Sequence, residues 1–381
     1  MVPLLGAVCF LCLLAVVHSY FVYPAMLLRA AARRCPTARA PGTVTEWPEV
    51  HILMSVHNEA VVLPQKLRSL ADLAYPGKLS VHIVSDCSTD ATNDLLRDFS
   101  GPGRMITYND RRRGKPASIN RLAATLPRAG IYVFTDASVI LRPETLTELV
   151  RPLAADDDLA VSDAVMVHTG IPEAGVGRLE DAYIRREVSL KQAASCLYAA
   201  LPGPFGGCWA LRARAFRPVP DTFLVDDFFL CLAAYEQGYG GVTATRAYAE
   251  EGVGIRLRDE FRRKRRIGAG NWQNLVRFRK LWWPPWRDTR AYVLFSHKIL
   301  RWLSPYLLVA GALSGLGLLA CLSNYRTAAA FLLAGLVACA SLPALRYFTA
   351  MNVALLVGGV DYLTGIKSNV WQPSHRNEDL E

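Results

Sequence analysis

Charged side chains are scarce in this chain and are missing altogether from its first 28 residues. Of the 381 residues 20% are charged and 52% are hydrophobic, which is apolar for a soluble protein but too polar for one lying wholly in a membrane. The first charged side chain is Arg29. A secretory signal peptide has basic residues before a short apolar core, whereas here they follow it. We therefore predict an uncleaved transmembrane anchor over residues 1–30.

Several sequence patterns that would indicate other classes of protein are also missing. No G-x-G-x-x-G fingerprint follows the first predicted strand, which argues against a nicotinamide-binding fold. The nine cysteines are scattered, and the close pair Cys9 and Cys12 lies in an uncharged apolar segment, unlike a zinc or redox site. No disulfide framework is apparent, as expected for a domain in a reducing cytosol.

The chain has a net charge of +10, but its basic residues do not form a stripe interleaved with aromatic residues, as in proteins that bind nucleic acid. The basic groups flank apolar ends and acidic clusters instead, so we expect anionic lipid or a diphosphate as partner and no nucleic acid.

Apolar segments return near the C-terminus. Residues 303–345 predict a transmembrane hairpin, and 346–381 a short re-entrant or interfacial segment with a tail. Residues 281–302, which include Trp282, Trp283 and Trp286 near their start, predict an interfacial amphipathic segment in which Lys298 and Arg301 snorkel. The alternative for this segment is a buried helix packed on the domain. We expect three spans, since a fourth would put the tail outside.

Basic residues set the predicted orientation. Arg29, Arg33 and Arg34 follow the first span, whereas only Arg326 lies in the opposite loop. By the positive-inside rule, the central domain and the tail are cytoplasmic. We thus predict a multi-pass protein of the inner (cytoplasmic) membrane.

Residues 45–280 alternate strand-like apolar runs with helical segments. Residues 49–56 predict a first strand and 61–73 a helix, and this βαβ alternation predicts a mostly parallel sheet. Asp86 and Asp136 each follow a later apolar run. The ends of such strands converge on one crevice, where the gathered carboxylates need a compensating cation or basic ligand. This pattern indicates an enzyme site for an anionic, metal-bound substrate.

Six motifs in a fixed order resemble the membrane-bound branch of family 2 glycosyltransferases, which contains cellulose and hyaluronan synthases and ceramide glucosyltransferases. The resemblance covers about residues 50–275 and a tail motif at 371–376. It implies a GT-A fold, a Rossmann-like nucleotide-diphospho-sugar transferase domain. The motifs are His57-Asn58-Glu59, Asp86-Cys87-Ser88-Thr89-Asp90, Gly114-Lys115-Pro116, Asp136-Ala137-Ser138, Asp226-Asp227 and Arg263 to Arg266.

The resemblance implies that Glu59 and Asp86 bind the ribose and base of a nucleotide sugar, most often a UDP sugar, since carboxylates accept from hydroxyls and base N–H groups. Lys115 would meet the phosphates. The alternatives are a helix-terminal acid for Glu59 and a solvated lysine for Lys115. For Asp90 we favour helix capping.

Asp136 stands for the first acid of an Asp-x-Asp metal motif, with Ser138 in place of the second. We expect a divalent cation, Mg²⁺ or Mn²⁺, bound by Asp136 and by the diphosphate itself.

The resemblance also makes Asp227 the catalytic base, with Asp226 orienting acceptor or base; two acids capping a helix are the alternative. Gly207 and Trp209 lie in a loop that resembles the acceptor side of the family's site. The alternative is that these residues belong to an ordinary loop and to the protein core, without a role in acceptor binding.

Arg263 and Arg266 are candidates for the diphosphate, because arginine forks bind its oxygens; a membrane-surface patch is the alternative. Processive synthases of the family have a tryptophan where this chain has Ile267. Trp371 and Arg376 in the tail would either close the active site or anchor the tail.

Together these expectations describe an inverting glycosyltransferase, hexosyl or N-acetylhexosaminyl, acting on a membrane lipid or lipid-linked glycan at the cytoplasmic face. A processive polysaccharide synthase is one alternative, and it would need assembled chains or membrane partners to form a pore. A non-catalytic sugar-nucleotide sensor or scaffold is another.

Overall fold

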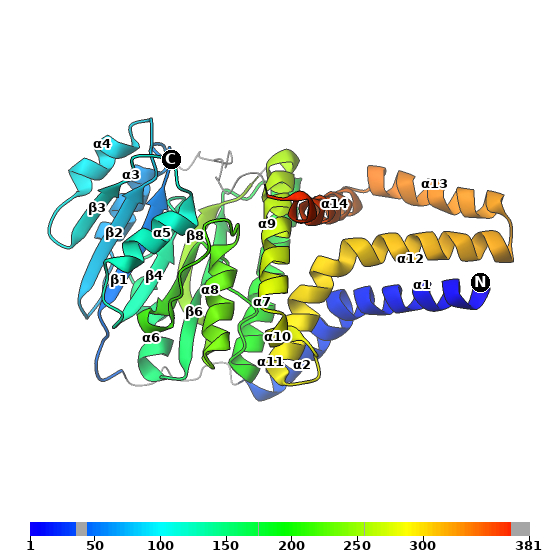
Figure 1. Cartoon of the computed structure of the whole chain (residues 1–381), viewed down its shortest axis with the longest axis horizontal. Coiled ribbons are helices and arrows are strands. Elements are labelled where there is room, and N and C mark those ends of the chain that lie inside the picture. The colour runs from blue at the N-terminus through cyan, green and yellow to red at the C-terminus, as the bar shows by residue number, and fades with distance from the viewer. Residues whose placement is uncertain (36–43, 174, 255, 367–381) are drawn as a thin grey trace.

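The computed structural model describes residues 1–35, 44–173, 175–254 and 256–366. An α/β domain occupies one end, and helices extend from it (Figure 1). The strands are β1 Val50–Val56, β2 Leu79–Ser85, β3 Arg104–Tyr108, β4 Ile131–Thr135, β5 Val139–Leu141, β6 Leu159–Thr169, β7 Cys208–Arg212 and β8 Gly240–Gly252. The domain helices are α3 Leu63–Ala71, α4 Thr92–Phe99, α5 Lys115–Ala124, α6 Thr145–Ala155, α7 Val176–Tyr198, α8 Asp226–Glu236, α9 Leu257–Arg277 and α10 Arg279–Trp282.

One mixed sheet organises the domain, in the order β3-β2-β1-β4-β7-β6-β8-β5. The first four strands are parallel, and β7 runs antiparallel to both β4 and β6. Strands buried on both faces are near-continuous apolar runs, and β1 and β4 have this composition. The parallel half was predicted, and it directs the ends of β1, β2 and β4 to one edge of the sheet.

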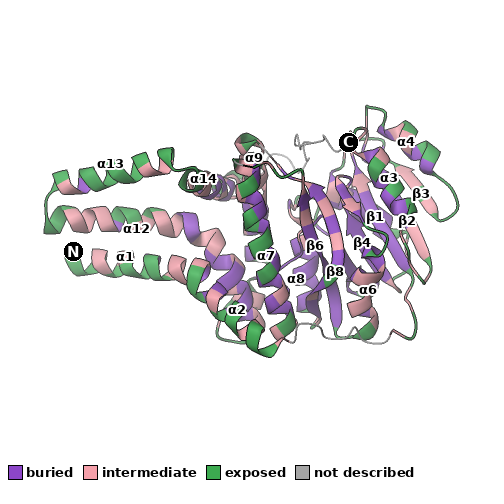
Figure 2. Cartoon of the chain, turned by 180° about the vertical axis from the view of Figure 1, so that it is seen from behind, coloured by how far each residue is buried: buried purple, intermediate pink, exposed green. Residues whose placement is uncertain are grey.

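Helices cover both faces of the sheet, and Figure 2 shows the strands buried between them. One core contains α3, α4 and α6 side chains such as Leu63, Leu96 and Leu149. The other contains α5 and α8 side chains such as Ile119 and Leu230. Burial on both sides holds the strand ends, and hence the residues that follow them, in fixed positions.

Helices from both ends of the chain lie together beside the domain, and some of them project far from it, with the N-terminus at the far end (Figure 1). They are α1 Val2–Val17, a π-helical turn His18–Val22, α2 Tyr23–Arg34, α11 Thr289–Leu294, a second π-helical turn Phe295–Ile299, α12 Leu300–Leu322, α13 Tyr325–Ser341 and α14 Pro343–Thr364. Three continuous helical segments of the described chain are long and apolar enough to cross a membrane, namely Val2–Arg34, Thr289–Leu322 and Pro343–Thr364.

The C-terminal helices differ from the predicted hairpin over 303–345. α13 has only 17 residues, whereas α14 has 22 and includes the segment expected to be re-entrant. Pro343 at the first turn starts the new helix. The charge of Asp361 does not end it, because Asp361 pairs with Arg265 of α9 at 2.6 Å.

The segment 281–302 also differs from its prediction as an interfacial helix. Leu294 and Leu300, which an interfacial helix would turn toward lipid, are buried. Lys298 and Arg301 do not snorkel, because both pair with the buried Glu187 of α7 at 3.0 and 2.7 Å. The alternative of a helix packed on the domain describes it better. Trp286 is exposed, as a membrane-interface residue would be.

A disulfide joins Cys35, at the end of α2, to Cys196 of α7. This pairing could not be predicted from the sequence, because the two cysteines are 161 residues apart and no spacing signals it. The packing of α2 along α7 brings the two cysteines together.

Candidate active site

A cavity of about 1220 Å³ opens where the ends of β1, β2 and β4 meet α7, α9 and α14. Nine of the ten predicted site residues line this cavity, and Trp209 does not. The lining includes Glu59, Asp86, Lys115, Asp136, Gly207, Asp226, Asp227, Arg263 and Arg266. The fold therefore brings together residues that are up to 207 positions apart in the sequence.

Asp86 organises the loop that leads into α5. Its buried carboxylate accepts hydrogen bonds from Asn109 Nδ2 and from the backbone N–H groups of Arg113 and Gly114, each at 2.8 Å. Gly114 has φ +85°, which suits glycine in this turn. Asp86 thus positions the start of α5 as well as lining the cavity. Whether it also binds a nucleoside stays a prediction.

The loop that carries Glu59 is held against the loop after β2. The Glu59 N–H donates to Thr92 Oγ1 at 2.9 Å, and the Ala60 N–H donates to Asp90 at 3.1 Å. Asp90 also accepts from the Thr92 N–H at the start of α4. Asp90 is therefore structural, since it ties this loop to the start of α4, but the N-cap of α4 is Ala91 and not Asp90. Glu59 remains at the cavity wall.

Lys115 is the first residue of α5 and lies among carboxylates. Its Nζ is 2.6 Å from Asp136 Oδ1 and 4.0 Å from Asp226 Oδ2. Burial disfavours the charge of Lys115, but Asp136 and Asp226 outweigh that effect and raise its pKa. Lys115 is therefore a fixed cation that links the end of β4 to the start of α8, and the reading of a solvated lysine does not hold.

Asp226 and Asp227 form the first turn of α8, where the helix dipole favours negative charge. Asp227 Oδ1 accepts a hydrogen bond from the Phe228 N–H at 2.7 Å. Burial, and then the charge of Asp226, raise the pKa of Asp227 to about 6. A carboxyl with such a pKa can accept a proton near neutral pH.

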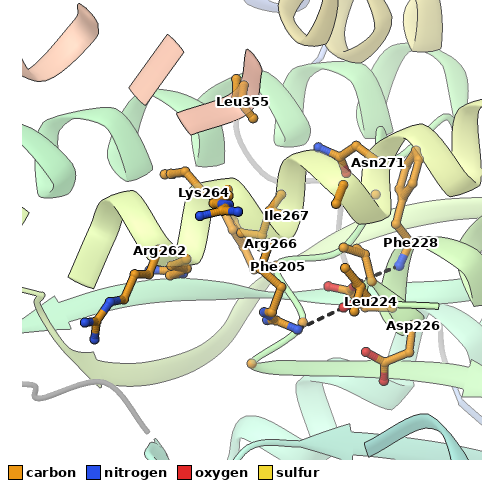
Figure 3. Close-up of a pocket in the computed structure, with 18 of the residues that line it drawn as sticks. Phe205, Leu224, Asp226, Phe228, Arg262, Lys264, Arg266, Ile267, Asn271 and Leu355 are labelled. Atoms are coloured by element: carbon orange, nitrogen blue, oxygen red, sulfur yellow. Dashed lines mark hydrogen bonds between the residues drawn. The ribbon is translucent and has the colours of Figure 1, made fainter. Parts of the chain in front are cut away.

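Two arginines reach the cavity from α9, but their surroundings differ. Arg266 Nη1 donates to the Leu224 carbonyl at 2.9 Å, close to Asp226 (Figure 3). Burial lowers its pKa, opposed by the charges of Asp226 and Asp227. Arg263 instead lies 3.5 Å from Glu260 and 4.0 Å from Glu180. Arg266 is thus the arginine nearer to the acid pair.

Trp209 does not lie at the cavity, so its predicted acceptor role is wrong. The ring is 1% exposed and stacks on Phe134 at 4.4 Å between centroids. β7 lies inside the sheet between β4 and β6, so the large ring is buried under the helices that cover this face. Gly207, just before β7, does line the cavity.

The cavity also contains side chains that sequence reasoning missed. Tyr20, Trp302 and Phe348 come from the apolar helices, and Glu251 comes from β8. No local motif marks these residues, because their place depends on how distant elements pack. The predicted tail residues Trp371 and Arg376 lie outside the residues that the structure describes.

Comparisons with known proteins agree with this architecture. Residues 51–219 match the family model described as glycosyl transferase family 2. An N-acetylglucosaminyltransferase of Mesorhizobium japonicum is 27% identical over 203 residues, covering 51% of this chain and 46% of the relative. A probable glycosyltransferase of Bacillus subtilis, YdaM, is 41% identical over 56 residues, covering 14% of this chain and 13% of the relative. The chain thus spans under half the length of these curated relatives.

A solved structure shares the fold along nearly the whole chain. It is the mannosyltransferase PcManGT from Pyrobaculum calidifontis in complex with GDP-Man and Mn²⁺, with a TM-score of 0.72 and 23% identity. The alignment covers 94% of this chain and 99% of that one, so the apolar helices are included. Residues 51–219 therefore match glycosyl transferase family 2, and the shared architecture shows that the domain has the GT-A fold.

Proposed function

We propose that this protein transfers a hexosyl or N-acetylhexosaminyl group from a nucleoside diphosphate sugar to an acceptor hydroxyl. The observation that carries the proposal is the meeting of Asp136, Lys115 and Asp227 in one cavity. A fixed cation suits the diphosphate, and a carboxyl of raised pKa suits the acceptor proton. The names of the relatives, an N-acetylglucosaminyltransferase and a mannosyltransferase, support the same reaction class.

The proposed reaction is a single displacement with inversion. The acceptor oxygen forms a bond to the anomeric carbon as the bond from that carbon to the diphosphate oxygen breaks. Asp227 takes the acceptor proton, and the nucleoside diphosphate leaves. Asp226 would hold the acceptor or the base in place, 4.0 Å from Lys115.

The leaving group needs positive charge around it. Lys115 and Arg266 reach the cavity as partly buried cations, and Arg263 lies three residues before Arg266 in α9. A divalent cation, when bound, would neutralise charge that develops on the diphosphate. The oxygen donor of Asp136 fits Mg²⁺ or Mn²⁺, and the mannosyltransferase complex contains Mn²⁺. Glu59 and Asp86 would bind the nucleoside, whether it is uridine or another nucleoside.

We infer a lipid or lipid-linked acceptor from the other end of the cavity. Tyr20, Trp302 and Phe348 bring aromatic surface from helices that are apolar enough to lie in a bilayer. An amphipathic acceptor could therefore meet the catalytic carboxylates without leaving the membrane. Transfer of a single sugar is favoured by Ile267, which lines the cavity where processive relatives have tryptophan, while Trp272 packs on Tyr306 and Tyr362 instead.

The test is release of nucleoside diphosphate by the full chain in detergent with Mn²⁺, a panel of UDP and GDP sugars, and extracted membrane lipids. Release that needs one sugar and a lipid together supports the proposal. Long products from one sugar alone would contradict single transfer. Nucleotide binding without release under any combination would contradict catalysis and favour a sensor.

A further inference from the structure

A second carboxylate lies beside the turn that carries Asp136. Ser138 occupies the position where the family pattern has its second acid, and it contributes a hydroxyl only. The turn is tight, since the Val139 N–H donates to the Asp136 carbonyl at 3.3 Å. β5 then pairs with β8, and the register sets Val139 opposite Glu251. Sheet pairing thereby brings a glutamate to the place where the local motif lacks an acid.

The contact between the two segments is direct. Ser138 Oγ donates to Glu251 Oε1 at 3.3 Å. Glu251 is 8% exposed, and it lines the same cavity as Asp136 and Ser138. The next residue back, Glu250, lies on the other face of β8, where it pairs with Arg142 at 2.7 Å. Of these two neighbouring glutamates, only Glu251 is directed to the active site.

A carboxylate buried to this extent is costly unless cations compensate it. Arg263 lies close enough to interact with Glu251, but it is shared with Glu260 and Glu180. His168 faces Glu251 across the β6–β8 pair and is itself within 3.6 Å of Asp181. Lys264 also pairs with Glu180 at 3.4 Å and Arg185 with Asp181 at 2.7 Å, so the basic groups near Glu251 are shared among several acids.

We propose that Glu251 supplies the second carboxylate of the divalent-cation site, in place of the acid that Ser138 replaces. Asp136, Ser138 and Glu251 then present hard oxygen donors from three positions, which suits Mg²⁺ or Mn²⁺, and diphosphate and water complete the coordination. The inference rests on the proposed function in so far as the cation serves a nucleoside diphosphate. It explains how a family member without the usual acid can retain its metal.

The experiment measures Mn²⁺ binding to the full-length protein in detergent, with UDP or GDP present, from the electron paramagnetic resonance signal of free Mn²⁺. We expect Glu251→Gln to weaken Mn²⁺ binding at least tenfold. Glu250→Gln is the matched control, because it makes the same change one residue away on the opposite face, and it should bind Mn²⁺ as the unaltered protein does. Equal binding by Glu251→Gln and Glu250→Gln would overturn the inference.

A second variant guards against a simple folding defect in Glu251→Gln. The double variant Ser138→Asp with Glu251→Gln moves the carboxylate to the position of the family's second acid, and we expect it to recover Mn²⁺ binding. A folded double variant that stays weak would count against a metal role. Transfer activity is assayed separately. If Mn²⁺ binding depends on Glu251 but no sugar is transferred, the proposed function is refuted and this inference is not. If sugar is transferred but Mn²⁺ binding does not depend on Glu251, this inference is refuted and the proposed function is not.

Discussion

Asp227 is subject to opposing demands from folding and catalysis. Burial and Asp226 raise its pKa to about 6, whereas an aspartate in an unfolded chain titrates at about 4. The folded protein therefore favours the protonated carboxyl, and this stabilisation is complete below the unfolded pKa and is lost as pH rises through about 6. As the proposed catalytic base, Asp227 must be ionised, so the proposal implies that the protein works at a pH where Asp227 destabilises it.

Replacing Asp227 by asparagine should separate these effects. We expect Asp227→Asn to lower transfer by about 100- to 10,000-fold, because the amide cannot take the acceptor proton. The same variant should melt at a higher temperature at pH 7.5, since residue 227 then carries no charge beside Asp226. Nucleotide affinity, measured by calorimetry, should stay within a few-fold. Full transfer activity in this variant would exclude Asp227 as the base.

The pH dependence of the unaltered enzyme gives an independent check. Transfer at saturating substrate should rise with pH through about 6, where Asp227 loses its proton, and should level off above pH 7. Initial rates measured from pH 5 to 8 in buffers of constant ionic strength test this. A flat profile across this range would mean that no such group limits the reaction.

Gly206 sets the space available to the same carboxylate. It has φ +86°, and a Cβ there would collide with Asp227 Oδ2. We expect Gly206→Ala to displace Asp227 and to lower kcat at least tenfold with nucleotide binding retained. Gly238→Ala is the matched control, because its φ of +92° carries the same backbone strain but its Cβ meets nothing within 4 Å. Equal losses in both variants would assign the effect to backbone strain.

The sequence predicted the charged part of the site better than its apolar part. Asp136 and Asp226 follow local signals, an apolar strand and a helix start, so their positions could be predicted from neighbouring residues. Trp209 was assigned wrongly, because its loop motif does not reveal that β7 lies inside the sheet. Glu251 and Tyr20 could not be found at all, since strand register and helix packing bring them to the cavity.

Charges in apolar segments caused the errors among the helices. In a hydropathy profile, the charges of Lys298, Arg301 and Asp361 mark the ends of apolar segments. In the structure, Lys298 and Arg301 pair with Glu187, and Asp361 pairs with Arg265. An ion pair removes much of the cost of placing a charge beside an apolar helix. The ends of α12 and α14 therefore depend on partners more than 90 residues away, which no local window contains.

The contact between α9 and α14 places Arg266 relative to the membrane helices. Gly358 of α14 lies against the backbone of α9, where a Cβ would collide with the Arg265 carbonyl. We expect Gly358→Ala to separate the helices, lower the melting temperature in detergent by several degrees, and weaken nucleotide binding. Gly335→Ala in α13 is the control, because its Cβ meets nothing within 4 Å and alanine favours a helix by up to about 1 kcal/mol. If both variants melt alike, the close contact does not contribute to stability.

The side of the membrane on which the domain lies decides which donor it can meet. Arg29, Arg33 and Arg34 at the domain end of the first helical segment favour the cytoplasmic side, where we propose that the nucleotide sugar is supplied. The disulfide between Cys35 and Cys196 points the other way, because disulfides persist mainly in oxidising compartments. The two observations require a direct measurement of orientation.

Cysteine labelling of spheroplasts distinguishes the two orientations. In a variant whose natural cysteines are replaced, Ser323→Cys places a thiol at the exposed turn between α12 and α13, and Asp98→Cys places one on the exposed side of α4. With a cytoplasmic domain, a membrane-impermeant maleimide should label Ser323→Cys in intact spheroplasts and Asp98→Cys only after the membrane is opened. The reverse pattern would put the domain outside, where the disulfide would persist and a cytosolic nucleotide sugar could not be the donor.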